Sequence, residues 1–538
     1  MLSSGRMLKP LPLRLGAFGW ITGTAFAYFL AQLAVGTDFR VAILFTLAIV
    51  FGLGAVRAAG GLRCAFGILN AVLLATFLLA AILLKVLMGE PADTNLYSPV
   101  TTSLVMALGF LGLWIATAAL LRLPRPKRQL MPDNYSAREY LALAAVLLVL
   151  TYGGYLIGMR PDLEGEGMQT GGILGYARAL ASFRSFVIVA VMFYVWKAGH
   201  KRFLSHPLVI AVLLFQTAAG ILATGKQEAM EPLFLYGVVA VMRLGLANRR
   251  IWILATLAVI FYAGLVYPYS QYVRFNGGRQ GNATYRVQAV SDTVWRLLTD
   301  PTFRDVVSAR IDLPSRLYWN SPSLAPFSRL AMVCEADRLI SATERTDSFT
   351  GWETITWGFK LLTPHALLPS KPIYPANNYL AHIAGDAAIR NDETQWAYGV
   401  FANLYNAFGL TGVLLGSIIT FGCFYYWLSL FFGNPHWTAA PTAGSLGLIF
   451  LIASYQHALV EDSVSSVIAS LTGPVILAFM CYLAHWTAGM FPAIRQPIGV
   501  RRGNRFSPPL RRPSRPPFDG RAPMNPFPGP KGGPGIQP

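Results

Sequence analysis

The sequence contains a series of uninterrupted apolar segments, each roughly 17 to 25 residues long, which is the length that an α-helix needs to cross a bilayer. Only 13% of the 538 residues are charged and 54% are hydrophobic, whereas a soluble chain has about a quarter of its residues charged. These features exclude a soluble enzyme, a disulfide-rich scaffold and a disordered regulator. They predict an all-α polytopic membrane protein.

We expect about twelve transmembrane helices, one for each apolar segment. They are predicted at residues 15–35, 41–57, 65–87, 100–121, 139–158, 174–196, 207–224, 231–247, 251–268, 408–431, 443–460 and 464–488. The first segment follows Arg6, Lys9 and Arg14, as a signal peptide would, but it is too long and lacks a small-residue cleavage site. We therefore interpret it as a retained span.

The Lys and Arg content of the short connections predicts the orientation of the spans, because cytoplasmic connections are enriched in basic residues. One alternating set of connections is basic and carries Arg57, Arg63, Arg122, Arg125, Lys127, Arg128, Lys197, Lys201, Arg202, Arg249 and Arg250. The other set is neutral or acidic on balance and carries Asp38, Arg40, Glu90, Asp93, Asp162, Glu164, Glu166, Glu461 and Asp462. This alternation places both chain termini in the cytoplasm.

Two long polar segments interrupt the series of spans, and they divide the chain into residues 1–14, 15–267, 268–407, 408–488 and 489–538. The segment 268–407 follows the ninth span, and helical spacing at 284–299 and 324–341 predicts a folded, mostly helical extracytoplasmic loop. The tail holds 13 of the 35 prolines, and nine basic residues against Asp519 give it +8 of the net charge of +19. We expect a disordered cytoplasmic tail and no nucleic-acid partner.

Cations at the predicted outer face are candidates for binding a lipid diphosphate, because guanidinium groups bind phosphate oxygens bidentately. They are Arg274, Arg279 and Arg286 after the ninth span, Arg184 in the sixth, and Lys226 in the turn between the seventh and eighth. A structural role is open for each. Tyr and Arg also mark the ends of spans, Arg178 and Arg184 become interfacial if their span starts near Phe186, and Lys226 can snorkel.

Amide and aromatic residues late in the large loop suit sugar binding, because amides bond to hydroxyl groups and rings stack on the CH faces of sugars. The candidates are Asn377, Asn378, Tyr379, Trp396 and Tyr405. The acid–base candidates are His365, and His457 with Glu461, whose i, i+4 spacing places both on one helix face. The same residues also suit ordinary loop turns and structural contacts.

No metal or cofactor is expected. The sequence has no Walker A loop, no GxGxxG after a strand, no GxSxG and no HExxH motif, and its four cysteines lack metal-ligand spacing. Asp162, Glu164 and Glu166 have carboxylates that a divalent cation could bind, but in an exposed glycine-containing loop we expect them to interact with water.

The arrangement resembles the O-antigen and oligosaccharide repeat-unit polymerases of bacterial inner membranes. The resemblance rests on the many spans, the large loop before the last three, the Gly225-Lys226 turn and the segment 395–416. In that segment a glycine, then a tyrosine, then Phe-Gly-hydrophobic-hydrophobic-Gly leads into a span, as in the family; the matching residues are Gly399, Asn403, Tyr405, Phe408, Gly409, Gly412 and Leu414. The family usually has arginine where this chain has Lys226.

The resemblance implies a GT-C-like, metal-independent glycosyltransferase in a bacterial inner (plasma) membrane. It would transfer a growing glycan from undecaprenyl diphosphate to the terminal sugar of another lipid-linked repeat. Its implied partners are polyprenyl-diphosphate-linked oligosaccharides, membrane lipids and a chain-length regulator.

Three alternatives remain open at this stage. An O-antigen ligase shares nearly every feature used above. A polyprenyl-phosphate sugar transferase would use a carboxylate in the first outer loop, where Asp38 is available but the loop is very short. A transporter or flippase for lipid-linked sugars would instead line a central cavity with cations.

Overall fold

The structure is a computed structural model. It describes residues 15–120, 130–131, 135–158, 180–222, 226–245, 247–275, 283–310, 318–363, 368, 376–386, 397–432, 441–450, 453 and 463–490. The predicted N-terminal segment 1–14 and the tail from residue 491 onward lie outside these ranges.

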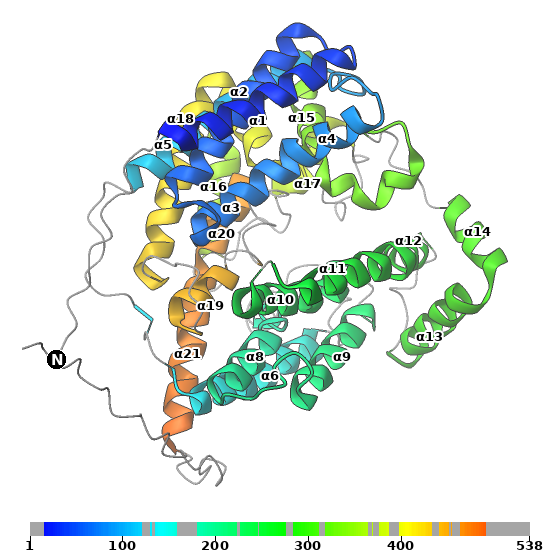
Figure 1. The fold of residues 1–538 in the computed structure, drawn as a ribbon, viewed down its shortest axis with the longest axis vertical. Helices are drawn as coiled ribbons and strands as arrows, with labels where there is room; N and C mark the ends of the chain where they lie inside the picture. The colour runs from blue at the N-terminus through cyan, green and yellow to red at the C-terminus, as the bar shows by residue number, and fades with distance from the viewer. Residues whose placement is uncertain are drawn as a thin grey trace, which may run out of the picture. The chain divides into compact units, whose positions relative to one another are not determined.

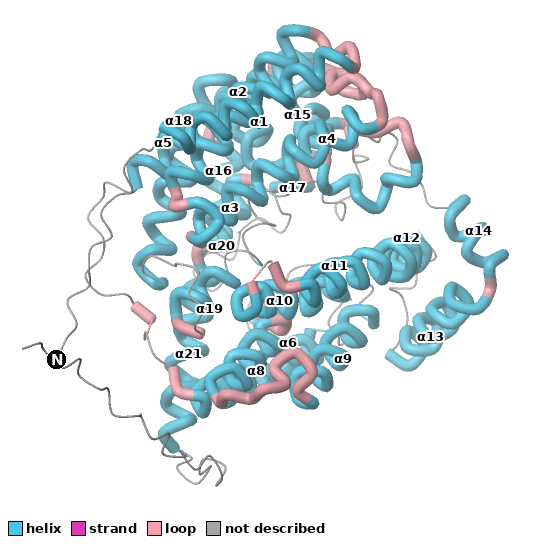
Figure 2. Tube along the Cα trace, viewed as in Figure 1, coloured by secondary structure: helices cyan, strands magenta, loops and turns pink. Residues whose placement is uncertain are grey.

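Helices are the only regular elements within these ranges (Figures 1 and 2). The first half of the chain forms α1 (Leu15–Ala34), α2 (Phe39–Ala58), η1 (Gly61–Arg63), α3 (Ala65–Leu74), η2 (Ala75–Leu79), α4 (Ala80–Leu87), α5 (Pro99–Leu120), α6 (Ala137–Gly158), α8 (Phe186–Lys197), α9 (Pro207–Leu222), α10 (Lys226–Leu244), α11 (Arg249–Phe261), η4 (Tyr262–Val266) and α12 (Tyr267–Phe275). The second half forms α13 (Ala283–Thr299), α14 (Pro301–Arg310), η5 (Pro322–Leu330), α15 (Met332–Thr346), α16 (Glu353–Leu362), α17 (Ala376–Ala384), α18 (Gly399–Phe432), α19 (Ala443–Phe450), α20 (Val464–Ser470) and α21 (Thr472–Met490).

Seven helical segments in the described part of the chain are long and apolar enough to cross a membrane. They are Phe39–Ala58, Phe66–Leu87, Pro99–Leu120, Ala137–Gly154, Arg249–Val273, Gly399–Phe432 and Val464–Met490. Two shorter apolar helices are Phe186–Lys197 and Pro207–Leu222. The chain is therefore consistent with a helical membrane protein, and the expected number of about twelve spans stays a prediction.

Four predicted span boundaries differ from the structure. The eighth span, α10, begins at Lys226 and not at 231, so Lys226 lies in the first turn of a helix and not in the turn before it. Residues 182–185 form a turn and α8 begins at Phe186, so the sixth span is not one helix from 174 to 196. Ser182 and Ser185 flank Arg184 there, and serine competes with helical backbone hydrogen bonds. The ninth helix continues through η4 and α12 to Phe275 and does not end at 268. The tenth, α18, begins at Gly399.

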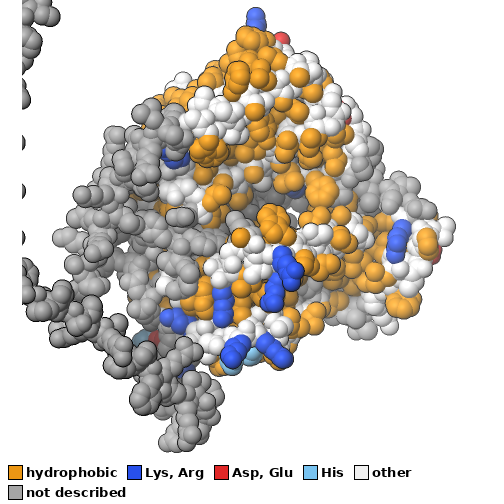
Figure 3. All heavy atoms as spheres, in the orientation of Figure 1, with side chains coloured by type: hydrophobic (Ala, Val, Ile, Leu, Met, Phe, Trp, Pro, Cys, Tyr) orange, Lys and Arg blue, Asp and Glu red, His pale blue; other side chains and the backbone are white. Residues whose placement is uncertain are grey.

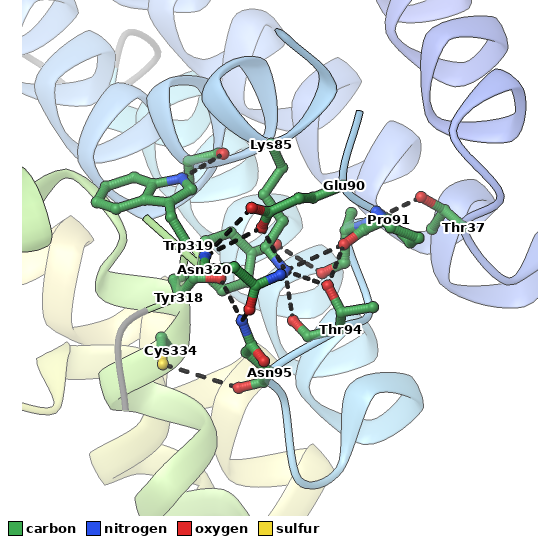
Figure 4. Close-up of polar contacts among 12 residues, drawn as sticks. Thr37, Lys85, Glu90, Pro91, Thr94, Asn95, Tyr318, Trp319, Asn320 and Cys334 are labelled. Carbon is green, nitrogen blue, oxygen red and sulfur yellow. Dashed lines mark hydrogen bonds and ion pairs between the residues drawn. The ribbon is translucent and has the colours of Figure 1, made fainter. Parts of the chain in front are cut away.

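Three segments predicted to face outside meet at one end of the helices (Figure 4). Thr37, after α1, accepts a hydrogen bond at 2.9 Å from the backbone N–H of Ala92, before α5. The hydroxyl of Tyr318 donates to the carbonyl of Ala92 at 2.6 Å, and Asn95 Nδ2 donates to the carbonyl of Tyr318 at 3.0 Å. The segment around 318–320 is thus fixed to the connection before α5, and that connection is fixed in turn to Thr37 after α1.

Segments predicted to face inside meet elsewhere. The backbone N–H of Leu130 donates to the carbonyl of Leu430 at 2.9 Å, and His485 Nδ1 lies 2.5 Å from Glu139 Oε1. Leu430 is near the last residue of α18, whereas Asn406, near its start, accepts from the backbone N–H of Thr350 at 3.0 Å. The connection with Leu130 and the loop with Thr350 therefore contact opposite ends of α18. The orientation of the spans in the membrane stays a prediction.

Small and polar residues allow the central helices to pack closely. A Cβ on Gly109 of α5 would lie 2.5 Å from the Phe401 ring of α18, so these two helices touch directly there. Asn70 Nδ2 donates to the carbonyl of Ala55 at 3.1 Å and to Thr117 Oγ1 at 3.3 Å, linking α3 to α2 and α5. Buried polar contacts of this kind connect helices in an apolar surrounding.

Candidate functional site

Four of the five predicted diphosphate-binding cations belong to neighbouring elements. We define the cationic corner as Arg184, the start of α10 with Lys226, and helices α12 and α13, which carry Arg274 and Arg286. Arg279 lies outside the described residues. About 100 residues of sequence separate the first of these elements from the last, so their proximity is a property of the fold.

The α9 and α10 helices approach each other very closely at this corner. A Cβ on Gly220 would lie 2.2 Å from the carbonyl oxygen of Glu228, so only glycine fits there. Arg184 Nη2 lies 3.7 Å from Glu228 Oε1, and Gln216 Nε2 donates to the carbonyl of Arg184. The turn before α8 is thereby fixed to both helices, and Glu228 offsets part of the positive charge of Arg184.

Lys226 is the first residue of α10, and its side chain contacts α12. Its Nζ lies 4.4 Å from the centre of the Tyr267 ring, within the range of a cation–π interaction. The hydroxyl of Tyr269 donates to the carbonyl of Ile221 at 3.0 Å. Both tyrosines belong to α12, so α12 is fixed against the end of α9 and the start of α10.

A small apolar cluster completes the corner. Tyr269 and Val273 of α12 pack with Val290 and Leu297 of α13 and with Phe303 of α14. Arg274 follows Val273 on α12, and Arg286 precedes Val290 by one helical turn on α13. Arg274 therefore lies on the helix that contacts Lys226, and Arg286 lies on the helix that packs against it.

Three of the five predicted sugar-binding residues lie together on α17. Asn377 and Asn378 lie in the first turn of α17 and are both only 3% exposed. Tyr379 donates its hydroxyl to Glu353 Oε2 at 2.9 Å and packs 5.1 Å from the Trp357 ring. Burial and the Glu353 carboxylate raise the pKa of Tyr379 to about 12. Of this trio, Tyr379 has the more accessible side chain.

The α18 helix contains a break within the segment that carries the family resemblance. Phe408 and Gly409 depart from helical geometry, and Gly409 has φ +64° and ψ −156°, a conformation that essentially only glycine adopts. The break frees backbone carbonyls, and those of Asn406 and Ala407 accept from the N–H groups of Thr350 and Gly351 at 3.0 and 3.1 Å. The segment before α16 thus docks on the break.

Aromatic rings from the segment before α16 pack against α18 next to the break. The Phe349 ring lies 6.3 Å from that of Tyr405, a predicted sugar-binding residue, and the Trp352 ring lies 5.0 Å from that of Phe408. Further along, Asn403 Oδ1 accepts from the N–H of Val464 at 2.9 Å, and its Nδ2 is buried without a hydrogen-bond partner. The motif residues therefore join α16, α18 and α20.

The predicted acid–base residues His365, His457 and Glu461 lie outside the described residues, as does Trp396. The structure instead shows a buried ionic cluster that the sequence analysis missed. Arg338 Nη1 lies 3.2 Å from Asp386 Oδ1, its Nε lies 3.7 Å from Glu335 Oε2, and Tyr398 donates to Asp386 Oδ2 at 2.8 Å. The i, i+3 spacing of Glu335 and Arg338 was the only local sign of this cluster.

Burial dominates the electrostatics of this cluster. It raises the pKa of Glu335 despite the nearby Arg338 guanidinium, and Glu335 Oε2 is buried without a hydrogen-bond partner. The cluster links α15 to the end of α17 and to the residue before α18. It is placed to hold these three elements together.

No group of three or more His, Cys, Asp or Glu residues that could bind a metal ion occurs among the described ranges. No protein-family model matches the chain, and no curated protein or solved structure matches it either. The functional argument therefore depends on the residues themselves.

Proposed function

We propose that the protein polymerises oligosaccharide repeat units linked to undecaprenyl diphosphate at the outer face of a bacterial inner membrane, with both termini in the cytoplasm. The observation that carries this proposal is the cationic corner. Lys226 contacts the helix that bears Arg274, and Arg184 forms an ion pair with Glu228 in the first turn of the same helix as Lys226. Cations on neighbouring elements, next to apolar helices, suit a substrate with a diphosphate on a polyprenyl chain.

The chemistry assigned to the corner is stabilisation of a leaving group. The bond between the anomeric carbon of the donor glycan and its diphosphate oxygen breaks, and a bond forms between that carbon and a hydroxyl oxygen of the acceptor sugar. The diphosphate leaves with the electron pair of the broken bond, so its negative charge increases in the transition state, and preorganised cations stabilise that charge. A base takes the hydroxyl proton; His457, oriented by Glu461, or His365 is proposed for this step.

The aromatic residues near the break in α18 support a role for this part of the chain in binding the acceptor sugar. Tyr405, Phe349 and Trp352 bring aromatic rings to one place, and Tyr379 with Trp357 forms a second aromatic pair. We assign sugar binding to this side of the molecule, through Asn377, Asn378, Tyr379, Trp396 and Tyr405.

Deleting the gene and analysing surface polysaccharide by gel tests the proposal. Single repeats on the lipid A core would support a polymerase. Long chains that remain on undecaprenyl diphosphate would point to the ligase alternative, and a lack of outward-facing repeats would point to a flippase.

Arginine variants test the diphosphate site directly. Arg274→Ala and Arg279→Ala should abolish chain extension while the protein abundance stays normal. Arg345→Ala is the matched control, because Arg345 is an exposed arginine at the end of α15, outside the cationic corner. Wild-type chain length in both corner variants would refute the diphosphate-binding role.

A further inference from the structure

Two short connections at the end predicted to be cytoplasmic carry a dense set of cations. They are the α8–α9 connection and the turn between α10 and α11, and Figure 3 shows Lys and Arg side chains gathered over the ends of these helices. The sequence contains no acidic residue in 195–206 or 243–250. The cations are Lys197, Lys201, Arg202, Arg243, Arg249 and Arg250, and all except Arg243 are exposed.

Arg243 connects the two segments. Its guanidinium carbon lies 4.3 Å from the centre of the Phe203 ring and 5.7 Å from that of Trp196, and its Nη2 donates to the carbonyl of His200 at 3.5 Å. Its Nη1 is buried and has no hydrogen-bond partner. Arg243 is therefore a half-buried cation, fixed between two rings, that adds to the positive charge of the exposed cations beside it.

The α8–α9 connection also carries two histidines, and the carbonyl of one of them, His200, accepts from Arg243. The rings of His200 and His206 lie 4.7 Å apart between their centres, and His206 Nδ1 accepts from the backbone N–H of Leu208 at 3.3 Å. That contact leaves Nε2 of His206 as the protonated nitrogen of the neutral ring. The α8–α9 connection therefore adds N–H donors next to the cations.

An exposed apolar surface begins directly after the cations. Trp252, Ile253 and Ile260 of α11 are 63%, 56% and 61% exposed. The segment Arg249–Val273 is the least buried of the seven candidate spans, with 17% of its most apolar window inside the protein. A lipid whose headgroup bound these cations could place its hydrocarbon chains along this helix. A soluble anion has no such chains and would leave this apolar surface uncovered.

We propose that the α8–α9 connection and the α10–α11 turn bind the headgroup of an anionic phospholipid, whose acyl chains lie along the exposed face of α11. The phosphodiester is attracted by Arg243 and by the five exposed cations. The positive-inside rule explains cations in these connections, but it does not explain why Arg243 of α10 is held between two rings of the α8–α9 side. Basic sites between helices at the cytoplasmic surface bind such headgroups.

Titration of the full-length protein in neutral detergent with a fluorescent phosphatidylglycerol tests the proposal. Unlabelled phosphatidylglycerol should displace the probe, whereas phosphatidylcholine and inorganic phosphate at the same concentration should not. The double variant Lys201→Gln/Arg202→Gln should bind about 25-fold more weakly, because each cation near an anionic lipid contributes about fivefold. Both side chains are exposed, so the variant should fold normally.

The matched control is Arg40→Gln/Arg345→Gln, which removes two exposed cations at the end predicted to face outside. Its affinity for the probe should equal that of the wild type. Unchanged affinity in the Lys201/Arg202 variant, or equal loss in the control, would overturn the site. Displacement by phosphatidylcholine would remove the anionic specificity, and displacement by phosphate alone would overturn the assignment to a lipid.

Discussion

The ammonium nitrogen of Lys226 lies 4.4 Å from the centre of the Tyr267 ring, so the first residue of α10 is held against the helix that carries Arg274. This contact brings Lys226 to the helix on which Arg274 lies, 48 positions later in the sequence. A cation held on a ring is pre-positioned, and pre-positioned charge stabilises a developing anion more effectively than a mobile side chain.

Replacing Lys226 tests whether its charge acts on the substrate. Lys226→Gln should lower the rate of chain extension by about 10²–10³-fold, the loss typical of one group that stabilises a developing negative charge. Lys226→Arg should retain most activity, because arginine keeps the charge and can bind phosphate bidentately. The measurement is polymer formation from purified lipid-linked repeats, and a fully active Lys226→Gln enzyme would contradict the assignment.

The backbone of Gly409 makes a prediction about stability. Gly409→Ala should reduce the free energy of unfolding by about 1–3 kcal/mol, because the backbone at φ +64° and ψ −156° is strained for any residue with a Cβ. Gly422→Ala is the control: Gly422 is helical and has open space around its Cβ position, so alanine should be neutral or slightly stabilising there. Unfolding in detergent compares the two, and equal effects would exclude backbone strain as the cause.

Lys85 makes a second prediction about stability, since it is fully buried at the end of α4 (Figure 4). Its Nζ donates to the carbonyls of Pro91 and Thr94 at 3.1 and 2.5 Å and lies 4.2 Å from the centre of the Tyr318 ring. Lys85→Met would remove the ammonium group from these two part-buried carbonyls and from the Glu90 carboxylate, which lies 4.0 Å away. We expect a loss of about 3 kcal/mol.

The exposed residue Lys360 provides the comparison for Lys85. Lys360→Met should change the free energy of unfolding by less than about 0.5 kcal/mol, as surface substitutions usually do. Thermal unfolding of both variants in the same detergent separates a buried polar network from a general effect of charge removal. A Lys85→Met variant as stable as the wild type would show that the network adds nothing to stability.

The features that sequence predicted well depend on local spacing. The apolar residues of 284–299 recur at helical intervals, and α13 spans Ala283–Thr299. The second predicted helix, 324–341, is divided in the structure into η5 and α15, which meet at Ala331. Ala331 has φ −127° and ψ 49°, a local change of direction that apolar spacing does not encode.

The features that sequence could not predict depend on distant partners. The carbonyls freed by the break at Gly409 are satisfied by Thr350 and Gly351, nearly 60 positions earlier in the chain. Likewise, Arg338 and Asp386 are far apart in the sequence, and only the fold brings them together. For the cationic corner, the residues were identified from charge at the predicted outer face, but the contact between Lys226 and Tyr267 required the structure.

The buried Glu335 side chain predicts a dependence of stability on pH. Burial raises its pKa in the folded protein above the ordinary glutamate value of 4.5. The folded state therefore holds the proton more tightly than the unfolded state does. The stabilisation is fully present below about pH 4.5 and is lost as the pH rises through the folded pKa.

Glu335→Gln should remove this dependence, because glutamine stays neutral. Melting temperatures of the wild type and the variant, measured from pH 4 upward, should diverge as the pH increases, with the variant gaining relative stability. Glu344→Gln serves as the control, since Glu344 is exposed on the same helix. Parallel curves for the wild type and Glu335→Gln would mean that the carboxylate is adequately solvated or paired when charged.

The native cysteines make a test of membrane orientation simple. Cys64, Cys334 and Cys481 are buried, and Cys423 is exposed on the apolar part of α18. Burial raises the pKa of Cys334 to about 12, so its reactive thiolate is scarce at neutral pH. The wild-type protein in spheroplasts should therefore resist a membrane-impermeant maleimide.

Ser348→Cys, exposed after α15, should be labelled at once, whereas Ser205→Cys, exposed between α8 and α9, should be labelled only after permeabilisation. The reverse result would invert the topology and place the cationic corner in the cytoplasm, where flipped lipid-linked repeats could not reach it.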